Sequence, residues 1–269
     1  MTRVALLARV VPPAALGTKR ARWLLERNLL VTRHTWFVVA SGFFEPLFYL
    51  LSLGVGIGPL VGAVEVGGRL VEYRAFVAPA MLAASAMNGA VLDTTANFFI
   101  KLRYAKTYDA VLATPLGVGD IALGEAVSAL ARGGVYSAAF LIVMTALGLI
   151  SSWWAVLALP AALLIGFAFA GAGLACTTFM RSWEDFQNIQ LAILPMFLFS
   201  GTFSPLSGYP AALRWVVQLT PLYHGVALVR SLCLGTIGPV LLGHAAYLGA
   251  MGSLGLVVAA RRMQRLLLA

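Results

Sequence analysis

The chain has 269 residues, of which 61% are hydrophobic and only 11% are charged, and its mean hydropathy is +0.90. Soluble domains carry about 25% charged residues, so this composition excludes a soluble globular protein. The net charge of +9 does not indicate a nucleic-acid-binding protein either, because the basic residues gather in short clusters between apolar runs, as they do in the cytoplasmic loops of membrane proteins.

Apolar runs long enough to cross a bilayer recur along the sequence and predict an all-α polytopic membrane protein. A single domain is expected: residues 1–34 form a cytoplasmic leader, residues 35–260 a bundle of six transmembrane helices, and residues 261–269 a cytoplasmic tail. Basic residues are most numerous in the leader, in the loop after the second span and in the tail, which predicts that both termini are cytoplasmic. The six predicted spans are residues 35–58, 74–97, 122–149, 153–179, 187–204 and 239–260.

Residues 18–33 of the leader separate into an apolar side and a basic side when they are placed on a helix. A basic amphipathic helix with a tryptophan, here Trp23, fits the inner membrane surface. We therefore expect an amphipathic interface helix before the first span, with an irregular charged leader as the alternative.

The first span contains Glu45 followed directly by Pro46. An ionisable residue at a helix centre costs about 2.5–3.5 kcal/mol and usually faces the bundle interior, and a proline removes a helix hydrogen bond. We interpret the pair as a bend and one polar contact in a helix that faces a transport pathway. The alternative is a protonated glutamate that hydrogen-bonds a neighbouring helix for packing alone.

Two further ionisable residues, Asp93 and Arg132, lie within the second and third spans. Arg132 follows Glu125 by two helical turns, so these two residues lie on one helix face. We expect an ion pair near the inner end of the bundle, either Asp93–Arg132 or Glu125–Arg132, and favour a structural role for it over substrate binding.

Three glycine-rich stretches, at residues 54–58, 166–173 and 249–255, supply small residues. Small residues let helix backbones approach closely in membranes, so these stretches predict close helix packing.

The loop after the second span, FFIKLRYAKTYDAVLATPLGVGD, is too polar for the bilayer, and its composition favours a helix over residues 98–113. Pro115 then ends or redirects the chain. This short cytoplasmic helix carries Tyr104, Tyr108, Val111 and Leu112, which would anchor a partner protein. A helix that lies on the membrane surface without a partner is the alternative.

Residues 202–235, between the fifth and sixth spans, have too few consecutive apolar residues for a span and too many for a solvated loop. They predict two short helices, at 210–219 and 222–233, that lie at or dip into the outer leaflet. Re-entrant backbone is tolerated only where protein or a water-filled cavity satisfies it, so a cavity at the outer face is expected. His224 is interpreted as an interfacial packing residue, and three histidines spread along the sequence predict no metal site.

Together with the six-span plan, these two loops resemble those of the permease subunit of a type-2 ATP-binding-cassette (ABC) exporter. In that family the first cytoplasmic loop ends in an acidic residue, an apolar pair and a Thr/Ser-Pro-aliphatic stop, here Asp109, Val111-Leu112 and Thr114-Pro115-Leu116. A second signature, Pro-Leu-x-His followed after five residues by Arg, is matched by residues 221–224 and Arg230. EPLFYLLSLGVGIG, KTYDAVLATPL and FLFSGTF are most similar to the bacterial branch associated with lipo-oligosaccharide (nodulation-type) and drug export.

The resemblance implies that two such permeases pair in the bacterial plasma membrane, as a homodimer or, alternatively, with a related chain. Two copies of a separate ABC ATPase subunit would dock beneath them and bind ATP and Mg. The chain itself is then not an enzyme and binds no cofactor, which agrees with the lack of a Gly-x-x-x-x-Gly-Lys-Ser/Thr loop in the sequence. The implied partners are membrane lipid and an amphiphilic substrate, whether a lipid-linked glycan, a glycolipid or a hydrophobic drug, and not nucleic acid.

The resemblance also implies roles for particular residues. The helix at 98–113 would be the coupling helix, which transmits closure of the ATPases to the spans, and the segment before the last span would be an outer gate. The expected ATPase-coupling residues are Tyr104, Lys106, Tyr108, Asp109, Leu112, Thr114 and Pro115. The expected gate residues are Pro205, Pro221, Tyr223, His224 and Arg230, and the pathway or intramembrane-charge residues are Glu45, Pro46, Asp93, Glu125 and Arg132.

An ion- or proton-coupled secondary transporter that uses Glu45, Asp93 and Arg132 is the alternative function. Secondary transporters usually contain internal repeats with broken helices in both halves, and the sequence has no clear repeat of this kind. An intramembrane protease is disfavoured, because residues 200–202 and His224 lack the Gly-x-Ser and histidine arrangement of such enzymes.

Overall fold

The computed structural model describes residues 27–28, 44 and 47–268. Glu45, Pro46 and nearly all of the leader predicted at residues 1–34 therefore lie outside the described residues. The predicted interface helix and the predicted bend in the first span are not addressed by the structure.

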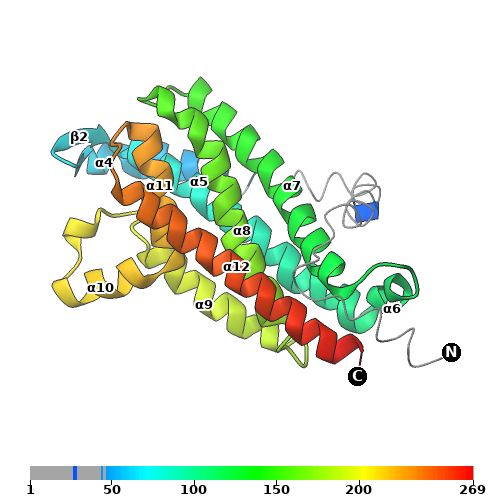
Figure 1. The fold of residues 1–269 in the computed structure, drawn as a ribbon. Helices are drawn as coiled ribbons and strands as arrows, with labels where there is room; N and C mark the ends of the chain where they lie inside the picture. The colour runs from blue at the N-terminus through cyan, green and yellow to red at the C-terminus, as the bar shows by residue number, and fades with distance from the viewer. Residues whose placement is uncertain (1–26, 29–43, 45–46, 269) are drawn as a thin grey trace.

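Four helices of the described chain are long and apolar enough to cross a membrane, and they coincide with the second, third, fourth and sixth predicted spans (Figure 1). The first of them is α5, which two π-helical segments, η2 and η3, extend to Tyr104. The bounds are α5 (Tyr73–Leu92), η2 (Asp93–Asn97), η3 (Ile100–Tyr104), α7 (Val118–Ala146), η4 (Trp153–Leu157) with α8 (Ala158–Thr177), and α12 (Val240–Leu267).

The fifth predicted span corresponds to α9 (Asp185–Phe199), whose 15 residues reach about 22 Å. That is short of the ~30 Å hydrocarbon core. Of the first predicted span the structure describes Phe44 and the residues from Leu47 onward, which form a helix that continues through η1 (Ser52–Ile57) and α4 (Gly58–Val61). The count of six spans therefore stays a prediction.

Helix α8 lies at the centre of the bundle and packs against α5, α7, α11 (Pro221–Leu234) and α12. Its closest neighbour is α12, because glycines face each other where the two helices cross. A Cβ atom added to Gly171 would meet the backbone of Gly252, and one added to Gly255 would meet the backbone of Gly171. The close packing predicted from residues 166–173 and 249–255 is therefore confirmed.

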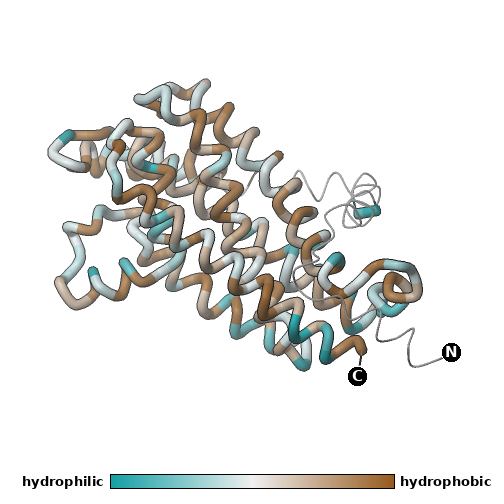
Figure 2. Tube along the Cα trace, in the orientation of Figure 1, coloured by the Kyte–Doolittle hydropathy of each residue, from teal (hydrophilic) through white to brown (hydrophobic). Residues whose placement is uncertain are grey.

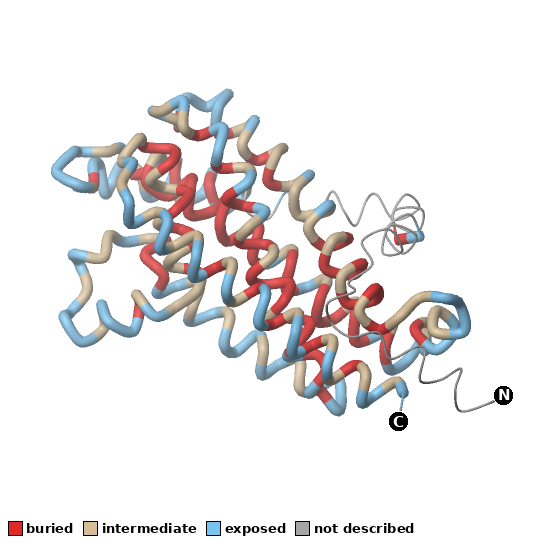
Figure 3. The backbone as a smooth tube through the Cα atoms, in the orientation of Figure 1, coloured by how far each residue is buried: buried red, intermediate tan, exposed pale blue. Residues whose placement is uncertain are grey.

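The buried residues are concentrated in α5, α8, α11 and the first half of α7, whereas α9 and α12 are mostly exposed or half-buried (Figure 3) although they contain many apolar residues (Figure 2). Helix α5 is buried along most of its length from Tyr73 to Val91. Helix α12 exposes Leu242, Leu254 and Val257 instead. Exposed apolar faces of this length suit contact with lipid.

A β-hairpin precedes α5 and was not expected from the sequence. Strands β1 (Ala63–Val66) and β2 (Arg69–Glu72) pair in antiparallel register, and the turn residues Gly67 and Gly68 both have positive φ. A Gly-Gly pair between short apolar runs is a hairpin signal, so the all-α prediction needs this one correction.

The hairpin and α10 (Ala211–Leu219) lie at one end of the bundle, called here the hairpin end; α6 (Thr107–Leu112) and the C-terminus lie at the other, called the α6 end (Figure 1). Helices α10 and α11 coincide with the two short helices predicted at 210–219 and 222–233, and η5 (Leu206–Gly208) precedes them. Their position in the outer leaflet stays a prediction.

The single helix predicted at 98–113 is wrong. Its first half belongs to the long α5 helix, which ends at Tyr104, and α6 is a separate helix that begins at Thr107. The break occurs at Lys106, whose φ of 46° is left-handed and cannot continue a right-handed helix.

Candidate transport pathway and coupling segment

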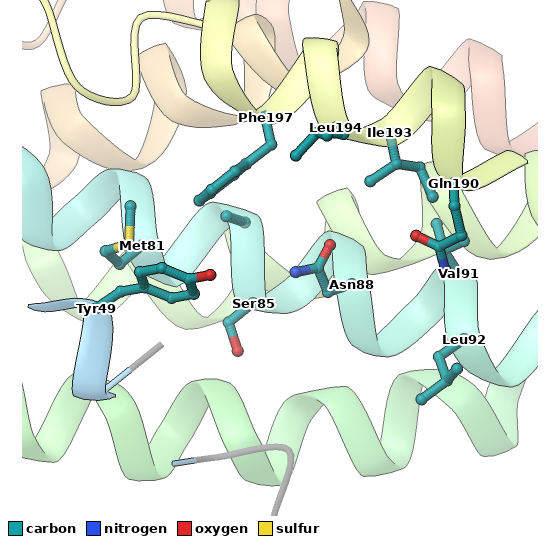
Figure 4. A pocket seen from close by; sticks show the side chains of 11 residues that line it. Tyr49, Met81, Ser85, Asn88, Val91, Leu92, Gln190, Ile193, Leu194 and Phe197 are labelled. Atoms are coloured by element: carbon teal, nitrogen blue, oxygen red, sulfur yellow. The ribbon is translucent and has the colours of Figure 1, made fainter. Parts of the chain in front are cut away.

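A cavity of about 350 Å³ lies between α5 and α9 and extends to Tyr49 (Figure 4). Side chains of both helices line it, and most of them are apolar. The polar exceptions are Ser85 and Asn88 of α5, Gln190 of α9, and the Tyr49 hydroxyl. Helix α5 contributes Met81, Ala84, Ser85, Asn88, Val91 and Leu92, and α9 contributes Gln190, Ile193, Leu194 and Phe197.

The two amides are the groups in this cavity most available to a ligand. Asn88 is exposed although α5 is buried around it, and Gln190 is exposed on α9. Neither amide forms a hydrogen bond with another residue in the part of the chain that the structure describes. A carboxamide both donates and accepts hydrogen bonds, so the two amides, one from each helix, can bind a neutral polar group inside the cavity.

Two ion pairs connect the end of the long α5 helix to α7. The Asp93 Oδ2 atom lies 3.1 Å from Arg132 Nε, and Asn97 Nδ2 donates to the other Asp93 oxygen at 2.8 Å. Glu125 pairs with Lys101 at 2.7 Å. Of the two pairings expected for Arg132, the structure therefore forms the one with Asp93, because Lys101 takes Glu125.

The charges sit where the α5 helix widens into its π-helical turns. The Thr94 and Thr95 hydroxyls donate to carbonyls one turn earlier, and Thr177 of α8 donates to the Thr94 carbonyl at 2.8 Å. π-Helical turns inside α-helices often occur at functional sites. Here the turns present Asp93, Asn97 and Lys101 along one side of the helix, toward α7.

We expect Arg132→Gln to lower the free energy of unfolding by about 2 kcal/mol, because it leaves the Asp93 carboxylate with an uncharged partner only. The double variant Asp93→Asn/Arg132→Gln should recover most of that loss, since no unpaired charge remains. Thermal unfolding in detergent measures both, with Arg69→Gln on the exposed strand β2 as the control. A double variant less stable than Arg132→Gln alone would contradict the structural role.

Tyr108 anchors α6 to the bundle. Its side chain is 1% exposed and packs on Phe98, with ring centroids 5.3 Å apart. The surrounding cluster includes residues of α7, α8 and α12. Burial, and secondarily the nearby Glu125 carboxylate, raise the pKa of Tyr108, so its hydroxyl stays neutral. Tyr108, expected to be available to a partner, instead points inward.

Most of the other expected coupling residues are exposed to solvent. Tyr104, Lys106, Asp109, Thr114 and Pro115 are exposed at the α6 end, and Leu112 is half-buried. The Thr114 hydroxyl donates to the Val111 carbonyl at 2.6 Å, which closes the turn after α6. A rigidly held helix therefore presents a small exposed surface with an acidic residue in its first turn.

At the hairpin end, Arg230 joins three segments. Its guanidinium donates to the Phe76 carbonyl of α5 at 3.1 Å and to the Gly201 carbonyl at 2.8 Å, and it lies over the Phe76 ring at 3.8 Å. Among the described residues no carboxylate lies within ion-pair distance of it. Pro221 begins α11, and Pro205 precedes η5. Arg230 thus fixes α11 against α5 and the turn after α9.

Two of the three histidines lie side by side in the fold although they are distant in the sequence. His224 and His244 approach with their Nδ1 atoms 2.7 Å apart, and the Tyr247 ring stacks on His224 at 4.1 Å. Tyr223 also contacts both imidazole rings. The described residues contain no group of three potential metal ligands. His224 therefore packs against His244, a neighbour that its position in the sequence did not reveal.

Comparison with known proteins gives the family. The sequence profile of the ABC-2 type transporter family matches residues 20–234 of the chain. The chain belongs to the ABC-2 type transporter family.

Several curated relatives are nodulation proteins. Nodulation protein J of Rhizobium leguminosarum bv. trifolii is 37% identical over 202 residues, which are 74% of this chain and 72% of that protein. Nodulation protein J of Rhizobium meliloti (strain 1021) is 33% identical over 228 residues, 83% of this chain and 85% of that protein. The counterpart from Rhizobium leguminosarum bv. viciae is 36% identical over 227 residues, 82% and 86% of the two chains.

The family membership confirms the resemblance recognised in the sequence. An ABC-2 permease is a multi-pass membrane subunit that works with an ABC ATPase and is not itself the ATPase. The helices of spanning length agree with this assignment. In this permease, sequence reasoning missed the cavity residues Ser85, Asn88 and Gln190, although uncharged polar residues inside apolar runs are a signal of function.

Proposed function

We propose that this permease is the transmembrane half of an ATP-driven exporter that moves an amphiphile with a neutral, hydroxyl-rich head, such as a lipid-linked glycan or a glycolipid. The observation that carries the proposal is the cavity between α5 and α9, where two carboxamides and two hydroxyls interrupt an apolar lining. A hydrophobic drug without hydroxyl groups would leave these amides unpaired.

The chemistry of the lining supports a neutral head. None of the described residues that line the cavity is charged. Amides exchange donor and acceptor roles with hydroxyl groups, whereas a charged head group would be desolvated without a counter-charge. The aromatic rings of Tyr49 and Phe197 supply apolar surface beside the amides.

The cavity size and the exposure of α9 fit an amphiphile better than a free sugar. Ligand pockets measure about 300–1,000 Å³, so 350 Å³ holds a segment of an oligosaccharide. Helix α9 buries no residue and exposes Leu191, Leu194 and Leu198. An alkyl chain can therefore lie along α9 while the head occupies the cavity.

The remaining arrangement follows the family. Two copies of the permease pair, and two ATPases bind ATP and Mg and dock at the α6 end, which faces the cytoplasm together with both termini. The exposed residues of α6 receive the ATPase, and Tyr108 transmits its movement to the spans. Pro205, Pro221, Tyr223, His224 and Arg230 act at the outer gate, and Glu45 with Pro46 bends the first span toward the pathway.

Ion coupling is the weaker candidate. Asp93 and Arg132 neutralise each other, as do Glu125 and Lys101. Paired charges favour a structural role over a role in carrying ions.

The double variant Asn88→Leu/Gln190→Leu tests the substrate proposal. We expect it to lower ATP-dependent export of a labelled lipid-linked oligosaccharide about tenfold, because the loss of two hydrogen bonds amounts to roughly 1.4 kcal/mol or more. Reconstituted vesicles with the ATPase measure it. Gln187→Leu, an exposed change on α9 outside the cavity lining, is the control. Unchanged export by the double variant, with the ATPase still bound, would overturn the assignment of the cavity.

A further inference from the structure

Arginine side chains converge on the turn between α8 and α9 at the α6 end. Arg262 of α12 donates from Nη2 to the Thr178 carbonyl at 3.4 Å, and Arg103, at the end of the long α5 helix, donates to the Met180 carbonyl at 3.3 Å. The Arg262 guanidinium also lies 3.9 Å from the centroid of the Phe179 ring. Two segments that are distant in sequence, the end of the long α5 helix and α12, thus place positive charge on one turn.

Positive charge exceeds negative charge in this cluster. Arg181 lies on the turn itself, and Arg265 follows Arg262 by about one helical turn, so both are exposed arginines close to the cluster along the chain. Within the described chain the ion pairs involve Arg74, Lys101 and Arg132, and none of the four arginines of the cluster has a carboxylate within 4 Å. Buried or clustered charges without counter-charges mark binding sites for ions of the opposite sign.

The nearest acidic residues already have another role. The Asp185 carboxylate accepts hydrogen bonds from the backbone N–H groups of Arg181 and Ser182, at 2.7 and 3.3 Å; these bonds and, to a smaller extent, the Arg181 charge lower the pKa of Asp185. Glu184 is exposed and forms no ion pair with a described residue. Neither carboxylate reaches the guanidinium of Arg262.

Capping of α8 explains only part of the arrangement. Carbonyls at a helix C-terminus commonly accept from arginine, which accounts for the Arg262 nitrogen that donates to Thr178, the C-cap residue of α8. The Nε atom of Arg262, however, is buried and has no hydrogen-bond partner among the described residues. A buried donor without a partner costs about 1–3 kcal/mol, so capping of the carbonyl alone does not account for the position of this guanidinium.

Apolar surface adjoins the arginines on one side. Leu254 and Val258 are exposed on α12 and precede Arg262 by two turns and one turn, so they lie on the same helix face. Phe179 and Trp183 are exposed beside the turn. Aromatic rings at the border of an apolar surface are typical of the membrane interface.

Resting on the orientation of the proposed function, in which the α6 end faces the cytoplasm, we propose that Arg262, Arg265, Arg181 and Arg103 bind the phosphate of an anionic phospholipid of the inner leaflet. Its acyl chains lie along Leu254 and Val258, and its phosphate accepts from Arg262. Basic sites at the cytoplasmic ends of membrane helices bind such head groups. The adjoining apolar face favours a lipid over free phosphate, and it distinguishes this site from the exposed surface of α6.

Native mass spectrometry of the permease purified with its ATPase in neutral detergent tests the proposal. The probes are phosphatidylglycerol, phosphatidylcholine and inorganic phosphate. We expect retained phosphatidylglycerol and little of the other two. Arg262→Gln/Arg265→Gln should lower phosphatidylglycerol binding about tenfold. Arg69→Gln/Arg214→Gln removes the same charge at the hairpin end and should leave binding unchanged.

Three results would overturn the proposal: phosphatidylglycerol binding unaffected by the double variant, equal binding of inorganic phosphate, or loss of the ATPase from the double variant while lipid binding persists. The last would make the cluster a docking surface for the ATPase. Should Arg262→Gln fail to fold, the exposed Arg181→Gln/Arg265→Gln variant replaces it and should lower lipid binding in the same direction.

Discussion

Asp109→Lys is expected to reduce substrate-stimulated ATP hydrolysis by the assembled complex at least about tenfold. Asp109 is exposed in the first turn of α6, which Tyr108 holds against the bundle. Reversing a charge at a contact with a partner typically costs 2–5 kcal/mol when its counterpart is buried. The rate of phosphate release, with and without substrate, measures the effect in reconstituted vesicles.

A matched change separates coupling from charge alone. Glu184→Lys makes the same reversal at the α6 end, on the exposed turn before α9, and should change stimulation no more than about twofold, as exposed charges contribute little. Both variants should insert into the membrane in wild-type amounts. Full stimulation in Asp109→Lys would remove the exposed residues of α6 from the mechanism.

Gly252→Leu is expected to prevent stable packing of α12 on α8. A Cβ at this position would already lie 2.9 Å from the Phe167 carbonyl oxygen and closer still to the Phe167 ring. A leucine must therefore separate the two helices, and we expect a loss of more than about 3 kcal/mol in the free energy of unfolding. Size-exclusion profiles and thermal unfolding in detergent measure it.

The same helix provides the control. Gly249 lies one turn earlier on α12, and a Cβ there would meet nothing within 4 Å. Gly249→Leu should leave the unfolding midpoint near that of the unchanged protein. Equal midpoints for Gly249→Leu and Gly252→Leu would show that the α8–α12 contact is not limited by the glycines.

Much of the helical framework could be predicted from the sequence, because apolar length determines a membrane helix almost alone. The two short helices before the last span were also located closely, since Pro210 directly precedes the first and Pro221 begins the second. The hairpin was missed although Gly67-Gly68 is its local signal. Hydropathy describes how apolar a segment is and not whether it folds back on itself.

The site depended on packing that the sequence does not encode locally. Nothing in RYAKTYD marks Lys106 as left-handed, so the break before α6 was not foreseen. The inward direction of Tyr108 depends on Phe98 and on α7 and α12. Asn88 and Gln190 lie about 100 positions apart and share a cavity only because α5 and α9 face each other.

The most direct test of the central claim is extraction of the permease from native membranes in a mild detergent, followed by identification of what co-purifies and by transport assays in vesicles. We expect an ABC ATPase to co-purify in an amount equal to the permease, and the vesicles to export a lipid-linked oligosaccharide only when ATP is present. In Asp109→Lys the ATPase should be lost from the complex or should no longer be stimulated by substrate. A permease that purifies alone and transports without ATP would contradict the central claim.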